Sequence, residues 1–536
     1  MEVVVANIWA LAASYFCYLL LSFMTSQSAA ARDQTLHSTK PSLLSLLSTG
    51  PWNLALDPLS AFNGFLALAF ISWDLFGHGS YHRQIMKMHD EYGPIVRVNP
   101  NELVVQDAEF FQTLYVAGGV GDVRRTQLRP GLGNGNDMDR AHPYTVGHDS
   151  HRRRRRPLEP FFSWLGVSQH HPLLSEMAAT LVKRLEDKRE TKSVVRLDHA
   201  FFAFAGDFVT RICFKNPAWS FLEEPDFGPG WYELLTTMVR FSLVLQNFGW
   251  IAKMPQWILK RHLEMFYPPV RYLREWKDMS LASVTEEMRI TQSQKSLAHR
   301  ENHAKPNSLF ERLFNSDLPA SVLTIDRIVN EAHILLLTET MFVARSMDHL
   351  VFQILSNPEI HNRLSEELRN AMAEHPREPP SVHRLQQLPY LQSCIKEGLR
   401  LSISTLHTRP RVSPDVELHY KEWVIPRGTA VGMHIYSMHM DPEVYPEPAT
   451  FQPARWLGDI DPRMARNWVP FMKGSHGCLD SSLALAEISI VIYALFGPKG
   501  PKLKLYETDA SDVRRVHGFV GSRPRMQSNG VRVTVE

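Results

Sequence analysis

One cysteine near the C-terminal end of the chain lies among residues whose types could do chemistry. Cys478 follows Gly474 and Gly477 in the stretch FMKGSHGCLD and precedes the helix-like run SSLALAEISIVIYALF. A thiolate in the first turn of a helix is stabilised by unpaired N–H groups and by the helix dipole, and Lys473 and His476 add positive charge. One thiolate can be the sole protein ligand of a haem iron. The alternative role is that of a small buried hydrophobic residue.

A carboxylate and two arginines upstream form a second set with a defined spacing. Glu397 and Arg400 lie three residues apart in KEGLR, and Arg455 follows in FQPARW. Residues three apart share one face of a helix. A carboxylate on that face can bridge two guanidinium groups through charge-assisted hydrogen bonds. The three side chains could therefore form one ionic cluster.

The composition bounds the classes of protein to which the chain can belong. It has 536 residues, 44% of them hydrophobic and 21% charged, which is typical of a globular protein. The formal net charge is only +2, from 58 basic and 56 acidic residues, so no global field attracts nucleic acid. The four cysteines, Cys17, Cys213, Cys394 and Cys478, are widely spaced. They indicate neither a disulfide framework nor a structural zinc site, and the chain is expected to face a reducing compartment.

The N-terminal residues have the composition of a membrane anchor. No charge occurs from Val3 to Met24, roughly the length that a membrane helix needs. A cleaved signal peptide is the alternative, but such peptides begin with positive charge, and this chain offers Glu2. We predict an anchor at 1–24, a linker and membrane-proximal segment at 25–80, and a catalytic domain at 81–536. The apolar run at 58–73 is shorter than a span, which favours a buried or membrane-surface helix.

Two structural elements can be predicted with their ends. The run YGPIVRVNPNELVVQD has two β-rich halves separated by Asn99-Pro100-Asn101, which predicts a hairpin. From Thr324 the pattern is helical until Asn357-Pro358 stops it, and about 30 residues at 1.5 Å each give a helix of about 45 Å. Its middle, ILLL, is apolar on every face, so this helix should run through the core.

Taken together, these motifs resemble those of the cytochrome P450 family. The family pattern F-x-x-G-x-R-x-C-x-G is matched at Phe471, Gly474 and Cys478, and L-A-x-x-E follows as LALAE. KEGLR supplies the E-x-x-R pair of the family, and HMDPEVYPEPATFQPARWL is a second long match. The order and spacing of these motifs agree from about Tyr81 to the end of the chain.

The resemblance implies a fold and a set of site residues. The implied fold is mainly α with a small β sheet, a triangular helical prism with a long central helix and a haem b buried beside the cysteine loop. Cys478 would be the metal ligand, and Glu397, Arg400 and Arg455 would be the structural triad that holds the segment under the haem. The residues implied to contact the haem are His151, Arg155, Arg409, Phe471, Gly474 and His476. For Arg409, a surface strand position is the alternative.

The resemblance also implies an activity and partners. YHRQIMKMHDEYGPIVRVNPNELVVQD and TVGHDSHRRRRRPLEPFFS are similar to filamentous-fungal members of the trichodiene oxygenase type. Such enzymes are monooxygenases anchored in the endoplasmic reticulum membrane, with a cytosolic catalytic domain. They oxidise lipophilic secondary metabolites, often terpenoids, with O2 and electrons from NADPH through a reductase. The arginines of 152–156 other than Arg155 would be solvated or face an acidic reductase, and no nucleic acid partner is expected.

The central helix departs from the family pattern. The family's A-G-T-E-T-T falls on Thr338 to Val343, so Met341 and Phe342 stand where an acid and an alcohol deliver protons to bound oxygen. A TET sequence survives two residues earlier, which makes Glu339 and Thr340 the candidate catalytic pair. Two residues correspond to about 200° of helical rotation, which a local π-bulge could partly correct. The bulky residues would narrow the oxygen side. Two alternatives to a monooxygenase therefore remain open: a haem-dependent isomerase or dehydratase, and a non-catalytic member of the family.

The cysteine loop departs from the family pattern at two positions. His476 replaces an arginine, and a histidine could still donate to a haem propionate. Asp480 replaces the glycine two residues after the cysteine, which puts a negative charge beside the thiolate. The alternative for Asp480 is the ordinary preference for aspartate in the first turn of a helix. We expect substrate contacts from 118–134, 337–342, 402–408 and 517–523.

Overall fold

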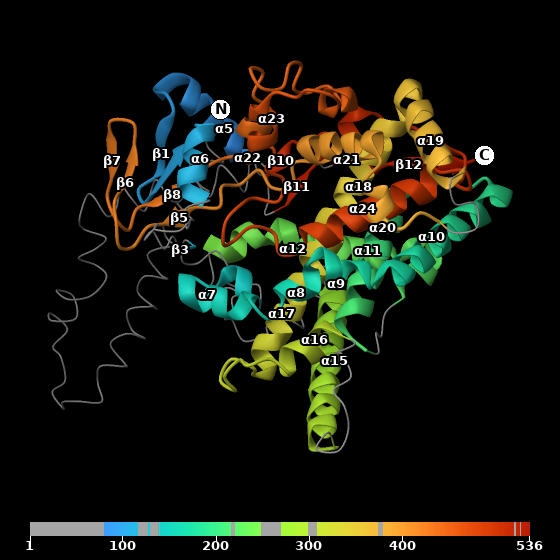
Figure 1. The fold of residues 1–536 in the computed structure, drawn as a ribbon, viewed down its shortest axis with the longest axis horizontal. Helices are drawn as coiled ribbons and strands as arrows, with labels where there is room; N and C mark the ends of the chain where they lie inside the picture. The colour runs from blue at the N-terminus through green and yellow to red at the C-terminus, as the bar shows by residue number, and fades with distance from the viewer. Residues whose placement is uncertain are drawn as a thin grey trace, which may run out of the picture. The chain divides into compact units, whose positions relative to one another are not determined.

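The structure is a computed structural model that describes residues 80–115, 127–128, 138, 140–215, 220–247, 270–297, 308–373, 379–518, 521–525 and 527–536 (Figure 1). The predicted anchor at 1–24, nearly all of the linker and most of the expected substrate segment at 118–134 lie outside these residues. Among the residues described, no helix is long and apolar enough to cross a membrane. The chain divides into two compact units after Val104.

The described part of the first unit is one helix and a hairpin. Helix α5 (Tyr81–Tyr92) is followed by β1 (Ile95–Asn99) and β2 (Glu102–Val105), which are neighbours in one sheet. The turn between them is stabilised by the Asn101 N–H, which donates to Asn99 Oδ1 at 2.9 Å. Tyr81 Oη donates to the Val98 carbonyl at 2.7 Å and ties the helix to β1. The predicted hairpin is confirmed.

The second unit is mainly helical, which confirms the predicted fold class. Its α helices are α6 (Ala108–Tyr115), α7 (His148–Arg155), α8 (Glu159–Phe162), α9 (Trp164–Ser168), α10 (His171–Thr191), α11 (Leu197–Cys213), α12 (Pro229–Asn247), α15 (Val270–Leu297), α16 (Leu309–Phe314), α17 (Ile325–Thr338), α18 (Ala344–Leu355), α19 (Pro358–Ala373), α20 (Val382–Leu385), α21 (Pro389–Ser402), α22 (Ile435–His439), α23 (Pro462–Asn467) and α24 (Ser481–Phe496). Shorter turns are η1 (His142–Tyr144), η2 (Phe221–Glu223), η3 (Pro225–Phe227), η4 (Glu339–Val343), η5 (Pro453–Trp456) and η6 (Ala510–Asp512).

Small antiparallel sheets lie between the helices. Strand β5 (Arg411–Val412) pairs with β3 (Gln127–Leu128) on one side and with β8 (Ala430–Gly432) on the other. Strand β12 (Arg532–Val535) pairs with β4 (Val195–Arg196) and β9 (Leu503–Leu505). Two hairpins complete the set, β6 (Leu418–Tyr420) with β7 (Trp423–Ile425), and β10 (His517–Gly518) with β11 (Ser522–Arg523).

The predicted long helix is present, and it contains a π turn. Helix α17, the π-helical turn η4 and helix α18 follow one another without a gap from Ile325 to Leu355. The helix ends before Asn357-Pro358, as predicted, and α19 begins at Pro358. Residues Glu331 to Leu337 are all buried, so the helix passes through the core. Helix α11, which is buried along nearly its whole length, packs against both η4 and α18.

The helix after the cysteine begins later than the sequence analysis assumes. Helix α24 covers the predicted run, but its first residue is Ser481 and Asp480 is its cap position. Cys478 therefore precedes the first turn instead of lying in it, so its predicted position in that turn is wrong.

Candidate active site

The Cys478 loop is a tight turn that directs its thiol into an internal cavity. The Cys478 N–H donates to the Phe471 carbonyl at 2.8 Å, and the Gly477 N–H donates to the Gly474 carbonyl at 2.9 Å. Gly474 has φ 76°, in the left-handed region that glycine occupies without strain. Lys473 Nζ donates to a carbonyl at 3.2 Å, that of Arg466. Cys478 has solvent-accessible surface, and this surface faces the cavity.

The cavity is large enough for an organic group. Its volume is about 180 Å³. One water molecule needs roughly 10–15 Å³ of such space, so the cavity can hold a much larger group. Its apolar lining comes from the central helix and α24 in particular, and includes Leu335, Leu337, Met341, Leu399, Leu479, Ala484 and Ile488. Phe471 also lines it, as does Ser404 with Thr405 from the expected 402–408 segment.

Basic side chains form one part of the cavity wall. They are His151, Arg155, Arg409, Arg411 and His476. Four of these are residues that the sequence analysis names as haem contacts, and the structure brings them together. Arg155 also joins α7 to the cysteine loop, because its Nη1 donates to the Gly477 carbonyl at 2.7 Å. Gly474 shapes the loop but is not among the cavity-lining residues.

Several nitrogen atoms in this basic wall lack a hydrogen-bond partner among the described residues. They are Arg411 Nη1, His151 Nδ1 and His476 Nε2. Arg411 is 2% exposed, and burial lowers its pKa to about 10. The rings of His151 and His476 are stacked with their centroids 3.6 Å apart. Burial, with the neighbouring cations, lowers the pKa of His151 to about 3 and lowers that of His476 as well.

Arg411 is a site residue that the sequence analysis misses. The analysis selects Arg409 from the same RPR sequence, and both arginines line the cavity. Arg411 lies on the short strand β5, between β3 and β8, where its side chain is buried. The only signal in the sequence is the pair of arginines on either side of Pro410. This pattern does not indicate which of the two side chains is buried.

One side of the cavity is formed by the π turn η4. Thr338, Glu339, Met341, Phe342 and Val343 line the cavity, as do residues of the preceding turn. Thr340 is not among the lining residues and is fully buried. Of the candidate catalytic pair, the structure thus brings Glu339 to the cavity and leaves Thr340 outside its wall.

The bulky residues of the central helix are enclosed by the C-terminal segment. A Cβ atom added to Gly521 would lie 2.8 Å from Met341 Cε and 3.4 Å from Phe342 Cε1. A side chain at position 521 would require the end of the flexible Met341 side chain to shift. This close approach agrees with the expectation that Met341 and Phe342 narrow this side of the cavity.

Two carboxyl groups, those of Asp480 and Glu339, lie near the cysteine, and a third, that of Glu487, lies near Asp480. Asp480 Oδ1 contacts Cys478 Sγ, and the Asp480 side chain makes no cap hydrogen bond to α24. Burial and the neighbouring Asp480 carboxyl raise the pKa of Glu339. Glu487, 1% exposed, has no partner for either oxygen among the described residues. Burial and Asp480 raise the pKa of Cys478.

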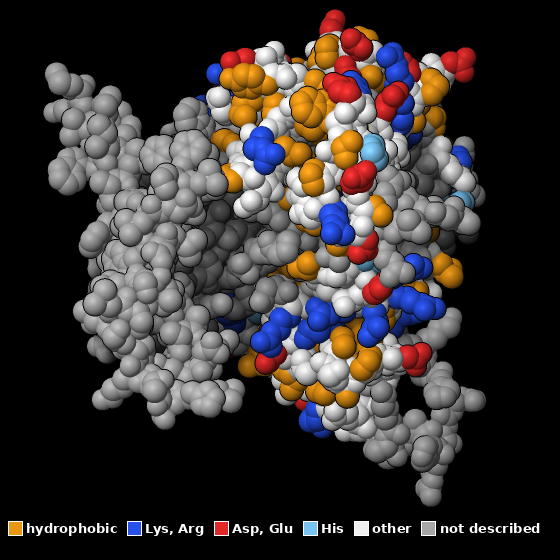
Figure 2. All heavy atoms as spheres, turned by 90° about the vertical axis from the view of Figure 1, so that its left-hand side faces the viewer, with side chains coloured by type: hydrophobic (Ala, Val, Ile, Leu, Met, Phe, Trp, Pro, Cys, Tyr) orange, Lys and Arg blue, Asp and Glu red, His pale blue; other side chains and the backbone are white. Residues whose placement is uncertain are grey.

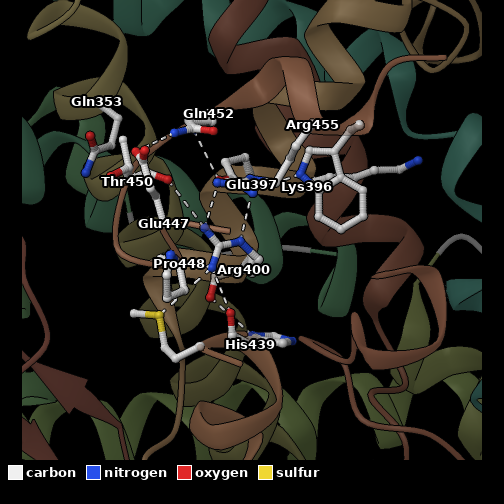
Figure 3. A network of polar contacts seen from close by, with 12 residues as sticks. Gln353, Lys396, Glu397, Arg400, His439, Glu447, Pro448, Thr450, Gln452 and Arg455 are labelled. Atoms are coloured by element: carbon white, nitrogen blue, oxygen red, sulfur yellow. Dashed lines mark hydrogen bonds and ion pairs between the residues drawn. The ribbon is translucent and has the colours of Figure 1, made fainter. Parts of the chain in front are cut away.

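The predicted triad is a buried cluster around one carboxylate (Figure 3). Glu397 Oε1 accepts from Arg400 Nη2 at 2.7 Å and from Arg455 Nε at 2.9 Å. Glu397 Oε2 accepts from Arg400 Nε at 2.9 Å and from Trp456 Nε1 at 2.9 Å. Glu397 and Arg400 are both 0% exposed. Figure 3 shows the two guanidinium groups turned toward the same carboxylate.

The Glu397 cluster extends to the segment before the cysteine loop. Arg400 Nη1 donates to the carbonyls of His439 and Pro448, both at 2.7 Å. His439 Nε2 accepts from the Val469 N–H at 3.0 Å, and Trp468 Nε1 donates to the Lys396 carbonyl at 3.0 Å. The start of the loop is therefore tied to α21 by hydrogen bonds on two sides.

A second buried ion cluster borders the cavity, and sequence reasoning does not find it. His142 Nδ1 contacts Glu331 Oε1, and Arg327 Nη1 lies 2.9 Å from Glu331 Oε2. His142 also lines the cavity, and its ring centroid is 6.1 Å from that of His151. Glu331 lies 189 residues from His142 in the chain, so no local pattern indicates the contact.

The described residues fit a haem with a thiolate ligand. The cavity has a thiol on its wall, apolar side chains for a flat macrocycle, and a buried guanidinium and two imidazoles with nitrogen atoms that lack a partner among the described residues. Unpaired buried donors are costly unless an acceptor satisfies them, and the propionate carboxylates of haem are such acceptors. Asp480 is the one lining residue of this loop whose charge does not favour a bound thiolate.

Comparison with known proteins gives consistent matches. The family model described as cytochrome P450 matches residues 65–496. Fusicoccadiene C-8 hydroxylase of Phomopsis amygdali is 46% identical over 466 residues, which cover 87% of this chain and 88% of that protein. Cytochrome P450 monooxygenase oblB of Emericella variicolor is 41% identical over 491 residues, 90% of this chain and 89% of that protein. Stellatic acid synthase of the same organism is 36% identical over 514 residues, with 90% and 92% covered.

Replacing Glu397 by glutamine should destabilise the folded chain by about 3–5 kcal/mol, because two buried guanidinium groups lose their counter-charge. Chemical denaturation followed by tryptophan fluorescence measures the free energy of unfolding. Glu366→Gln is the matched control, since Glu366 is an exposed helical glutamate, and it should change this energy by less than about 0.5 kcal/mol. Equal effects of the two substitutions would contradict the importance of the cluster.

Proposed function

The chain belongs to the cytochrome P450 family of monooxygenases, and from this membership we propose that it is a membrane-anchored enzyme that oxidises a terpenoid-type secondary metabolite at a haem held by Cys478. One observation carries the proposal: the Cys478 thiol and apolar side chains of the central helix line the same cavity. Arg411, His151 and His476 line it as well, and each has a nitrogen atom without a hydrogen-bond partner among the described residues.

Each group of cavity residues has a defined task in this proposal. A haem with a thiolate ligand, when bound, supplies the electron density that favours O–O cleavage. Cys478 Sγ is the ligand atom, and Arg155 steadies its loop through the Gly477 carbonyl. Arg155, Arg409 and Arg411 hold the propionate carboxylates, and the apolar wall excludes water from the reacting carbon.

Glu339 is the residue that we propose for proton delivery on the oxygen side. It lies in the π turn, lines the cavity and is 2% exposed. Its Oε1 has no hydrogen-bond partner among the described residues, so this atom can exchange a proton with a group inside the cavity. Thr338, the residue before Glu339 in the sequence, also lines the cavity. Its hydroxyl group donates to the Ile334 carbonyl at 2.8 Å. Thr340 does not line the cavity, so it would take part in proton delivery only if the conformation of the π turn changed.

The proposed substrate is a lipophilic hydrocarbon or a lightly oxidised derivative of one. The cavity residues on the central helix and α24 are mostly apolar, and apolar surface is the main source of affinity for such ligands. A similar protein is named as a hydroxylase of fusicoccadiene, a diene. We therefore propose a terpenoid-type diene or a related hydrocarbon as the substrate class.

The reduced, carbon-monoxide-bound absorption spectrum of the full-length chain in yeast membranes tests the haem assignment. We expect the red-shifted Soret band of thiolate-ligated haem, and we expect Cys478→Ser to abolish it. Cys394→Ala is the matched control, because Cys394 is buried in α21 and is not a cavity residue. A band at the ordinary haem-protein position, or no haem in the unsubstituted chain, would overturn the proposal.

A row of basic side chains supports electron delivery from an acidic reductase that draws on NADPH. Figure 2 shows Lys and Arg side chains crossing the lower part of one face, at the level of α7 in Figure 1. Arg152, Arg153 and Arg156 are exposed, and no carboxylate of the described chain forms an ion pair with them. Exposed cations of this kind raise the rate of association with an acidic partner.

Replacing Arg152, Arg153 and Arg156 together by glutamine should slow NADPH-dependent oxidation of a diene such as fusicoccadiene by roughly tenfold at low salt, because steering of the reductase is lost. The difference should vanish at high salt, where charges are screened. The exposed arginines Arg369, Arg427 and Arg514 provide a control triple substitution. Equal rates for both triple variants at low salt would exclude this surface as the docking site.

We also propose that residues 1–24 anchor the enzyme in the endoplasmic reticulum membrane with its catalytic domain in the cytosol. The support is the lack of charge from Val3 to Met24, roughly the length of a span. Alkaline extraction of yeast membranes should leave the full-length chain in the pellet and release a chain that starts at residue 25. If both chains stay in the pellet, the anchor lies elsewhere, for example in 58–73.

A further inference from the structure

A histidine that is backed by a buried carboxylate faces the cavity at the edge of its basic wall. His142 lines the cavity, and its ring contacts Glu331 of the central helix. We propose that His142 binds a hydroxyl group of the substrate through its Nε2 atom, so that the enzyme acts on a terpenoid-type alcohol in preference to the bare hydrocarbon. The inference rests on the proposed function, in which this cavity receives the substrate, and it narrows the substrate class.

The contacts with Glu331 fix the direction of the His142 ring. Nδ1 contacts Glu331 Oε1, and the His142 backbone N–H donates to Glu331 Oε2 at 3.2 Å. A carboxylate only accepts hydrogen bonds, so Nδ1 carries the hydrogen of this contact. Glu331 does not line the cavity, whereas His142 does. The edge of the ring that bears Nε2 is therefore left to face the cavity, and Nε2 makes no hydrogen bond with a described residue.

A hydroxyl group is the oxygen function that suits this nitrogen. In the neutral ring Nε2 accepts a hydrogen bond, and in the protonated ring it donates one. A hydroxyl group can do both, whereas a carbonyl or ether oxygen can only accept. An alcohol is therefore bound by His142 in either state of the ring.

The charge of Glu331 is balanced away from the cavity. Arg327 Nη1 lies 2.9 Å from Glu331 Oε2, and the two side chains are 4% and 0% exposed. Neither residue lines the cavity, so this pair presents no uncompensated charge that would attract a haem propionate. Arg155, Arg409 and Arg411 offer such charge on the basic wall, whereas the His142 cluster suits a neutral group.

The segment that carries His142 is fixed on two sides. The Arg140 N–H donates to Asn330 Oδ1 of the central helix at 3.3 Å. Arg154 Nη1 of α7 donates to the Arg140 carbonyl at 3.0 Å and to Thr145 Oγ1 at 2.9 Å. A group that is held in position before its ligand arrives loses little conformational entropy on binding. His142 is thus a preorganised contact for a ligand.

The polar side chains that line the cavity from the central helix do not duplicate this contact. Thr338 and Ser346 carry hydroxyl groups, but both already donate to backbone carbonyls, at 2.8 and 2.9 Å. Glu339 comes eight residues after Glu331, which corresponds to about 12 Å along a helix at 1.5 Å per residue. An alcohol beside the first turns of this wall therefore meets His142 as its polar partner.

A hydroxylated substrate requires an earlier reaction that installs the hydroxyl group. One such reaction is the addition of water to a carbocation with loss of a proton. The other is the oxygenation of a C–H bond, in which O2, two electrons and two protons yield the alcohol and water. The inference thus places this enzyme after a step of one of these two classes.

Binding of a matched alcohol and hydrocarbon to the full-length, haem-loaded enzyme in yeast membranes tests the contact. The probes are farnesol and farnesene, and the shift of the Soret band during titration gives the Kd of each. The ratio of the two Kd values decides, because partition into the membrane cancels when variants are compared. We expect His142→Phe to weaken farnesol binding by about tenfold, since one hydrogen bond to a buried nitrogen is lost, and to change farnesene binding by less than twofold.

A second variant and a control accompany this measurement. His142→Asn keeps a hydrogen-bond donor for Glu331 and removes the ring, so it should lose the preference for farnesol in the same way if His142→Phe does not fold. His333→Phe is the matched control. His333 is a buried residue of α17 that packs against Trp276 with ring centroids 4.2 Å apart, and it does not line the cavity. This substitution should leave the ratio of the two Kd values unchanged.

Three results would overturn the inference. One is a ratio that His142→Phe and His142→Asn leave unchanged. Another is the absence of a spectral shift with farnesol in an unsubstituted chain that shows the thiolate-type band with carbon monoxide. The third is a loss of haem from the folded His142 variants, which would assign this residue to a propionate. A missing thiolate-type band in the unsubstituted chain would instead overturn the proposed function, so the two failures are distinguishable.

Discussion

The structure around the site depends on one buried carboxylate. Glu397 is fully buried and accepts hydrogen bonds from two arginines, one tryptophan and the Gln452 N–H. Taking these charges out of water costs several kcal/mol per ion, which their attraction offsets only when every hydrogen bond is made. This requirement fixes the geometry more strictly than apolar packing would, because a small displacement of η5 or α21 breaks two or more bonds. The cluster is therefore better understood as a constraint on position than as a source of stability.

That constraint reaches the cysteine in a few steps. Arg400 holds His439, the imidazole of His439 accepts the Val469 N–H, and the Met472 N–H donates to the Val469 carbonyl at 3.0 Å. Burial, with the nearby Arg400 cation, lowers the pKa of His439 to about 3, so its ring is neutral and can accept at Nε2. The next hydrogen bond closes the loop between Phe471 and Cys478. The sulfur is thus placed by backbone and side-chain bonds that lie outside the cavity.

Local sequence signals predict the elements of this fold well, and they predict contacts across it less well. The hairpin after Tyr92, the helix after Asp480 and the long helix up to Asn357 each carry their own turn or periodicity signals. The three residues of the Glu397 cluster follow from spacing and family pattern. Arg411, the His142–Glu331 contact and the meeting of Glu339 with Asp480 do not, because each depends on which faces of distant elements come together. The sequence analysis anticipates a π-bulge as one way to reconcile the displaced TET, but only the structure gives its bounds, Glu339 to Val343.

The charges around the cavity are segregated, and this bears on how a ligand can enter it. The pKa of His476 is lowered by burial and by the neighbouring side chains of Arg411, His151, Arg155 and His142. The pKa of Glu339 is raised by burial and by the neighbouring side chains of Asp480, Glu487 and Cys213. No acid is among the groups that shift the pKa of His476, and no cation is among those that shift the pKa of Glu339. The described cavity wall therefore has a basic part, which includes His476, and an acidic part, which includes Asp480, and Cys478 lies between these two residues in the sequence. A flat ligand with carboxylates on one edge is attracted to the basic part and repelled by the acidic part, which favours one orientation. The two carboxyls that line the acidic part are those of Glu339, in the π turn of the central helix, and of Asp480, at the start of α24.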